Sequence, residues 1–152
     1  MRDSYAVDRE KGPFAEWRAG ARIDLDDRES WWRPWHTLIT ETVARGVVVR
    51  RARVVSEPAS EYTRWLHSGT MKNIIAGEQV RWMPRRLASD IPLPGNDFWL
   101  VDDRLIRWNH FTGDGASGGG EMSQDEATAQ LCAAAFASVW ARATPHDQYD
   151  LR

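Results

Sequence analysis

The segment from Asn109 to Gly115 combines residue types used in acid–base chemistry with two glycines. His110 can act as a base or a ligand near neutral pH, and Asp114 can orient it or bind a cation. The glycines let a ligand approach the backbone closely. The alternative is that Asn109 and Asp114 organise a turn while His110 makes one structural hydrogen bond. This segment is the first candidate for a catalytic site.

Two glutamates form a second candidate, because each lies beside a turn-forming residue at the end of a regular segment. Glu57 precedes Pro58, and Glu78 follows Gly77. If the fold brings them together, they form a carboxylate pair suited to general acid–base work. The alternative is that each caps a helix or pairs with an arginine, the nearby ones being Arg50, Arg53 and Arg81.

Nine tryptophans in 152 residues are the most unusual feature of the composition. Trp31, Trp35 and Trp140 fall on apolar helical stripes and are expected in the core. Other aromatic residues lie near arginine-bearing segments, where a pocket for a planar or anionic ligand can form. The candidates for ligand binding are Arg53, Tyr62, Trp65, Trp99, Arg107 and Trp108. Core packing is the alternative for each of these aromatic residues.

Several functional classes lack their signatures. No G-x-G-x-x-G, P-loop, H-E-x-x-H or G-x-S-x-G is present, so no cofactor is expected. The four histidines are too dispersed to indicate a metal site, and the single cysteine, Cys132, is expected to be a buried apolar residue. A net charge of -2 gives no reason to expect direct binding of nucleic acid. Neither a signal peptide nor a run of about 20 apolar residues is visible, so we expect a cytoplasmic protein that does not contact membranes.

Helical and strand periodicities alternate along the chain. An apolar stripe predicts a helix over 31–45, and the capping box formed by Ser123 and Glu126 predicts another near 125–142. A short helix is expected over 60–67, ended by Ser68-Gly69. Strands are expected at 47–55, 79–83, 97–101 and 105–111, the last two joined by a turn at Asp102-Asp103-Arg104.

These elements predict one α+β domain over residues 13–152, preceded by a flexible segment over 1–12. We expect a mainly antiparallel sheet of four or five strands, covered on its apolar face by the two amphipathic helices. The face that bears Arg and Trp would then stay uncovered. The glycine-rich stretch from Gly113 to Gly120 is expected to be a surface loop.

Several segments resemble a known family. They are Arg53-Val54-Val55-Ser56-Glu57-Pro58, Ala76-Gly77-Glu78, Leu93-Pro94-Gly95-Asn96-Asp97-Phe98-Trp99 and the Asn109–Gly115 segment. Together they resemble DUF6879, an uncharacterised actinobacterial family with no established activity, catalytic residue or cofactor. The order of elements also looks like a phospholipase D-like half-domain, although the H-x-K-x4-D signature of that superfamily is missing.

The resemblance implies a regulatory setting, because members of the family are often found beside helix-turn-helix regulators. We therefore expect a noncatalytic binding or regulatory module that acts with a partner protein, such as a helix-turn-helix transcription regulator. One alternative is a hydrolase or phosphate-processing enzyme that uses Asn109, His110 and Asp114. Another is a binder of a small aromatic or anionic metabolite, which predicts a site lined by tryptophan.

Overall fold

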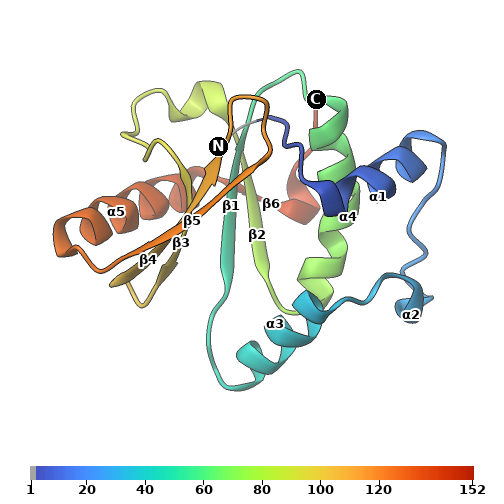
Figure 1. Cartoon of the computed structure of the whole chain (residues 1–152), viewed down its shortest axis with the longest axis horizontal. Helices are drawn as coiled ribbons and strands as arrows, with labels where there is room; N and C mark the ends of the chain where they lie inside the picture. The colour runs from blue at the N-terminus through green and yellow to red at the C-terminus, as the bar shows by residue number, and fades with distance from the viewer. Residues whose placement is uncertain (1–2) are drawn as a thin grey trace.

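Two parallel strands form the centre of the molecule. In the computed structural model, which describes residues 3–152, β1 (Arg50–Val55) pairs in parallel with β2 (Gln79–Pro84). The helix α4 (Glu61–Ile75) connects them, as parallel neighbours require a crossover connection. A two-residue strand, β6 (Thr144–Pro145), pairs antiparallel with β2 and completes a mixed three-stranded sheet (Figure 1).

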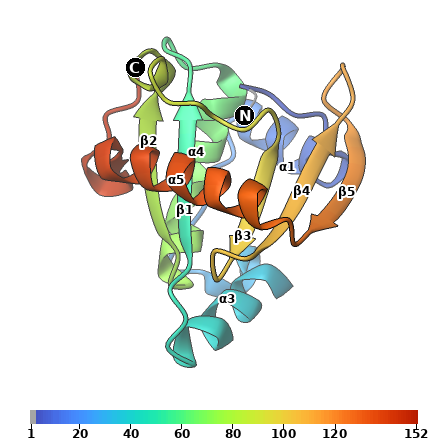
Figure 2. The same cartoon turned by 90° about the vertical axis from the view of Figure 1, so that its left-hand side faces the viewer.

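Helices cover both faces of this sheet. Because neighbouring residues of a strand point to opposite faces, Val55 packs with Leu66 of α4, while Val54 packs with Val139 of α5 (Glu126–Arg142). Figure 2 shows α5 running across one face of β1 and β2, with α4 behind them. Two faces covered by helices are the usual environment of parallel strands.

The second sheet is an antiparallel meander of β3 (Asp97–Val101), β4 (Leu105–Phe111) and β5 (Ser117–Ser123). Asp102 and Asp103 are the central residues of the first turn, in which the N–H of Arg104 donates to the carbonyl oxygen of Val101 over 3.1 Å. Their φ values of 51° and 54° are those of a type I′ turn. Ile106 of β4 packs on Cys132 of α5, and both are fully buried. The helix α5 therefore packs against both sheets and contributes buried residues to the core of each.

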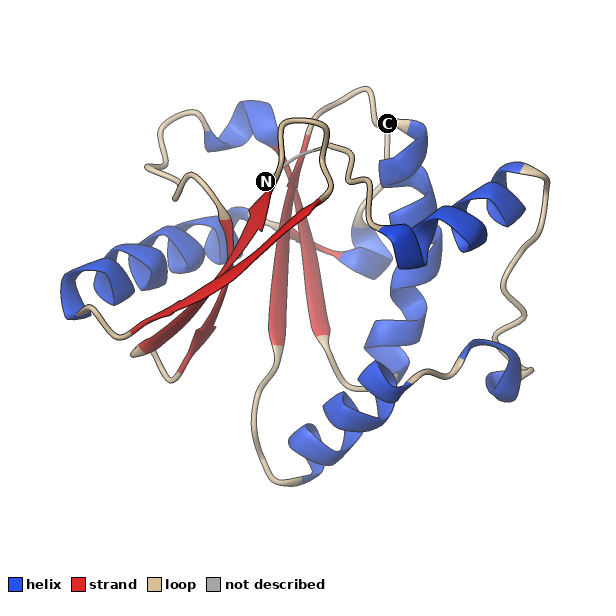
Figure 3. Ribbon diagram, viewed as in Figure 1, coloured by secondary structure: helices blue, strands red, loops and turns tan. Residues whose placement is uncertain are grey.

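Three further helices lie on the side of α4 (Figure 3). The helix α1 (Asp8–Arg18) packs on α4 through Phe14, and α2 (Arg28–Trp31) is a single turn. The helix α3 (Pro34–Ala44) contacts the second sheet through its own Trp35. Short 3-10 turns follow β2 and β6, at Arg85–Ala88 and His146–Gln148. No helix in the described part of the chain is both long enough and apolar enough to cross a membrane.

The predicted α+β class is confirmed, and the strands at 97–101 and 105–111 have the predicted bounds. The prediction of a single, mainly antiparallel sheet is wrong, because β1 and β2 are parallel and form a sheet separate from that of β3, β4 and β5. The cause is the length of α4, which continues past Ser68-Gly69 and can therefore cross over the sheet. The same helix covers the face expected to stay free, so that Trp82 has no exposed surface.

Two further expectations are corrected. The helix predicted over 31–45 is divided into α2 and α3, because Pro34 can only occupy a first helical turn. The loop predicted over Gly113–Gly120 contains the start of β5. Its glycines allow a close approach to β4: a Cβ on Gly120 would lie 2.8 Å from the carbonyl oxygen of Trp108.

Candidate functional site

The two candidate glutamates do not form a carboxylate pair. Glu57 follows the end of β1 and Glu78 precedes the start of β2, so the length of the parallel strands, about 20 Å, separates them. Glu78 is 2% exposed and accepts hydrogen bonds from Nε and Nη2 of Arg51, at 3.0 and 2.9 Å. Asn73 donates a third at 3.0 Å. Glu78 thus has an arginine partner, but it is Arg51 rather than Arg50, Arg53 or Arg81.

Glu57 is held at the opposite edge. The hydroxyl of Tyr149 donates to its carboxylate over 3.0 Å, and Nε of Arg86 lies 3.7 Å away. Its side chain is 14% exposed. Glu57 is therefore paired with Tyr149 and Arg86 and not with Glu78.

The Asn109–Gly115 segment does not bring its three polar side chains together. Asn109 and His110 are neighbours in β4 and so point to opposite faces of the strand. Asn109 accepts from Nη1 of Arg107 over 2.8 Å, and Nε2 of His110 lies 3.6 Å from Glu121. Asp114 accepts from the hydroxyl of Thr112 in the turn that follows. Asn109, His110 and Asp114 therefore do not converge on one site, as the catalytic alternative would require.

The predicted ligand-binding residues divide among several places. Trp108 packs with Phe98 above the α5 core. Trp99 contacts Trp35, and its ring lies 5.1 Å from the guanidinium carbon of Arg51. The remaining members lie elsewhere: Arg107 is exposed on β4, and Trp65 packs with Tyr62 and Phe14 between α4 and α1.

Arg53 is the member whose environment is unusual. Its Nε is buried and has no hydrogen-bond partner among residues 3–152. The guanidinium carbon lies 5.4 Å from the ring centre of Trp82, its register partner in β2. Burial, together with the charge of Arg51, lowers the pKa of Arg53 to about 10, so the side chain remains a cation at neutral pH. The residue as a whole is half-buried, so part of it reaches solvent.

Trp82 also contacts two histidines that no pattern in the sequence connects. Its indole N–H donates to Nδ1 of His146 over 3.1 Å. The ring centre of His67 lies 5.0 Å from that of Trp82. Nε2 of His67 is another buried atom without a partner in the described chain. Burial lowers the pKa of both histidines, that of His146 to about 4. The residues are 79 positions apart in the sequence, so no local spacing could have revealed the cluster.

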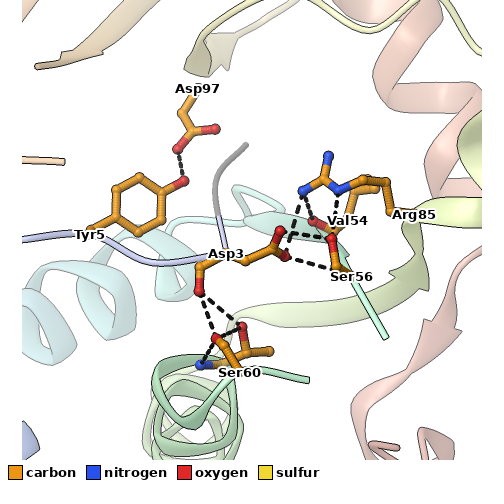
Figure 4. A network of polar contacts seen from close by, with 8 residues as sticks. Asp3, Tyr5, Val54, Ser56, Ser60, Arg85 and Asp97 are labelled. Atoms are coloured by element: carbon orange, nitrogen blue, oxygen red, sulfur yellow. Dashed lines mark hydrogen bonds and ion pairs between the residues drawn. The ribbon is translucent and has the colours of Figure 1, made fainter. Parts of the chain in front are cut away.

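Residues 3–6 form an extended segment, here called the N-terminal strap, that joins the two sheets (Figure 4). The carboxylate of Asp3 accepts from the backbone N–H of Ser56 at 2.8 Å and from its hydroxyl at 2.7 Å. Nη2 of Arg85 lies 3.7 Å from the same carboxylate. The hydroxyl of Tyr5 donates to Asp97 on β3. Residues 1 and 2, which begin the segment predicted to be flexible, lie outside the described residues.

A hollow of about 300 Å³ adjoins the site of Asp3. It is lined by Ser56, Glu57, Pro84, Arg85, Arg86 and Ser89. These residues follow or end β1 and β2, so the hollow lies at the carboxyl ends of two parallel strands. Ligands of α/β sheets characteristically bind outside this edge. The sequence did not single out Ser56, Arg85 or Asp3, which meet only in the folded chain.

No curated protein matches this chain, and no solved structure does. The resemblance to a phospholipase D-like half-domain therefore remains a prediction. The family model for a domain of unknown function, DUF6879, matches residues 1–150, and the chain belongs to that family.

Proposed function

We propose that this protein is a noncatalytic binding module whose ligand presents an anionic group to Arg53. The observation that carries the proposal is the buried Nε of Arg53, which has no partner within residues 3–152. Removing a cation from water is costly unless a counter-ion or hydrogen-bond acceptors replace the water. A carboxylate or phosphate oxygen would supply what Arg53 lacks, and a guanidinium suits both.

The surroundings of Arg53 favour a small ligand that binds at its exposed side. Trp82, without exposed surface, supports the guanidinium from within the sheet and cannot itself stack on a ligand. Tyr62 and Tyr5 lie near enough to Arg53 to oppose the lowering of its pKa. The expected ligand is thus a small metabolite that carries an anionic group, and aromatic character would suit the neighbouring tyrosines.

The dispersal of Asn109, His110 and Asp114 over a strand and a turn supports binding rather than the alternative of a hydrolase or phosphate-processing enzyme. The proposal includes a partner protein, such as a helix-turn-helix transcription regulator, that responds when the ligand binds. Recovery of a regulator with the tagged protein from its native host tests this part. Repeated recovery of none, under conditions that preserve weak complexes, contradicts it.

The binding site is tested by thermal unfolding with a panel of small carboxylates, including acetate and benzoate, at constant ionic strength. We expect at least one of them to raise the unfolding midpoint of the wild type, because a ligand that binds only the folded state stabilises it. The Arg53→Met variant should lose this response. Without ligand, this variant should be as stable as the wild type or more so, since an unpaired buried charge has been removed.

Arg50→Met is the matched control, because Arg50 lies on the same strand beside Phe136 and Trp140 but is exposed. It should respond to the anions as the wild type does. An Arg53→Met variant that keeps the full response would refute the assignment, and so would a wild type that no member of the panel stabilises.

A further inference from the structure

The carboxylate of Asp3 is bound as a separate anion would be. It accepts one hydrogen bond from a backbone N–H and one from a hydroxyl, both of Ser56, and faces the guanidinium of Arg85. Backbone and hydroxyl donors beside an arginine are the common elements of phosphate and carboxylate sites. The site does not depend on the residue that fills it, because its donors come from Ser56, directly after β1, and from Arg85, in the turn after β2.

Arg85 is held in place by contacts other than Asp3. Its Nε donates to the hydroxyl oxygen of Ser56 over 3.1 Å, and its Nη2 donates to the carbonyl oxygen of Val54 over 3.3 Å. These bonds fix the guanidinium against the end of β1. A site whose donors are already positioned binds an anion without first ordering them.

The contact between Asp3 and this site is open to exchange. The side chains of Asp3 and Arg85 are 36% and 38% exposed, and partly exposed ion pairs contribute little to stability. The hydroxyls of Ser60 and Thr63 add bonds to the carbonyl oxygen of Asp3, at 2.7 and 3.4 Å. The end of the strap at Asp3 is thus a tethered occupant held by a few polar contacts, whereas Tyr5, two residues on, packs its ring on Phe111 and Tyr62.

The adjoining hollow has room for the rest of a ligand. Its volume of about 300 Å³ lies directly beside Ser56 and Arg85, with Arg86 and Ser89 on its wall. Glu57, the one carboxylate on this wall, is directed to Tyr149 and Arg86. A phosphate at the position of the Asp3 carboxylate could therefore extend a small organic group into this space.

We propose that Ser56 and Arg85 form a binding site for a phosphate group, and that Asp3 is its built-in competitor. A phosphate-bearing ligand displaces Asp3 and thereby releases the strap from Ser56 and Ser60. Because the strap also contacts the second sheet through Tyr5 and Ala6, its release changes the surface that both sheets present. This site is separate from the one assigned to Arg53 and does not depend on it.

The first test is calorimetric titration with inorganic phosphate at constant ionic strength. A tethered carboxylate competes at a high effective concentration, so Asp3→Ala should bind phosphate about tenfold more tightly than the wild type. Adding Arg85→Met to Asp3→Ala should abolish the gain. Asp8→Ala, which removes an exposed carboxylate paired only with Lys11 in the described chain, should bind as the wild type does. Asp3→Ala that binds phosphate no more tightly than the wild type would overturn the proposal.

Two additions make the result decisive. Asp3→Asn, which keeps an oxygen acceptor but loses the charge, replaces Asp3→Ala if that variant does not fold, and it should bind phosphate several-fold more tightly than the wild type. Arg53→Met should leave the gain unchanged, which separates this site from the proposed function. A gain that disappears with Arg53→Met would assign the phosphate to Arg53 and refute the present proposal.

The second test uses the wild type alone. The amide of Ala6 donates to the carbonyl oxygen of Gly115 over 2.9 Å, so its hydrogen exchange reports whether the strap is attached. Saturating phosphate should speed exchange at Ala6 and leave the amides in the middle of α5 unchanged. Exchange at Ala6 that is unaffected or slowed by bound phosphate would show that the strap is not displaced.

Discussion

The indole N–H of Trp82 donates to Nδ1 of His146 over 3.1 Å, so this nitrogen must be unprotonated in the folded protein. Burial lowers the pKa of His146 to about 4, and the nearby His67 adds to the effect. The unfolded chain, with a pKa near 6.5, then binds more protons than the folded chain between these values. We predict that the free energy of unfolding decreases as the pH falls from about 6.5 to 4, as measured by urea titration across this range.

His146→Asn keeps an acceptor for Trp82 but cannot be protonated, so it should reduce this pH dependence. His110→Asn should retain the pH dependence, because His110 lies on β4, away from the cluster of Trp82, His67 and His146. A wild type whose stability is constant from pH 6.5 to 4 would contradict the assignment of buried neutral histidines.

Arg51 and Glu78 form the buried ion pair of the fold, and its two halves differ in burial. The side chain of Glu78 has no exposed surface, whereas that of Arg51 is 23% exposed. Arg51→Met leaves a buried carboxylate with only Asn73 as a partner and should cost about 3–5 kcal/mol in unfolding free energy. Glu78→Gln should cost less, because Arg51 can still reach water.

A double variant, Arg51→Met with Glu78→Leu, should recover part of the loss, because no uncompensated charge remains. Arg50→Met on the same strand, with an exposed side chain, should change stability by no more than about 0.5 kcal/mol. Equal losses for the Arg50 and Arg51 variants in chemical denaturation would argue against a buried pair.

Local patterns predicted the elements well where one face of a strand or helix is buried. In β4, the alternation that places Ile106 and Trp108 on one face is visible in the sequence and gave the strand its bounds. Gly69 misled the prediction for α4, because a glycine usually weakens a helix interior. In the fold, the helix continues through Gly69 to Ile75, and β2 is parallel to β1. A Cβ on Gly69 would lie 3.6 Å from the side chain of Lys72 and 3.8 Å from that of Ile23.

The candidate site was less accessible to prediction, since its contacts join distant parts of the chain. Arg53 and Tyr62 were singled out for their chemistry, but nothing local shows that Nε of Arg53 lacks a hydrogen-bond partner within residues 3–152. Asp3 and Ser56 are 53 residues apart, and no periodicity relates them. Pairing of Glu78 with Arg51 rather than Arg53 likewise depends on which side chains of β1 reach the start of β2.

Gly120 tests whether the glycines of β5 serve close strand contact. A Cβ at this position would lie 2.8 Å from the carbonyl oxygen of Trp108 and 3.2 Å from the guanidinium of Arg107. The first neighbour is backbone and cannot move without disturbing β4. Gly120→Ala should therefore cost about 1–3 kcal/mol in unfolding free energy. Gly95→Ala, where a Cβ meets nothing within 4 Å, is the control and should be close to neutral in the same denaturation experiment.

The start of α5 distinguishes two caps that the sequence offers. The capping box predicted Ser123, but the N-cap is Asp125, whose carboxylate accepts from the backbone N–H of Thr128 at 2.7 Å. Asp125→Ala should lower the unfolding free energy by about 1 kcal/mol, because it removes both the cap and a negative charge at the helix N-terminus. Ser123→Ala should have a smaller effect, because its hydroxyl accepts only from the N–H of Asp125, over 3.2 Å. Chemical denaturation of the two variants decides the matter, and a larger loss for Ser123→Ala would restore the capping box as the true start of the helix.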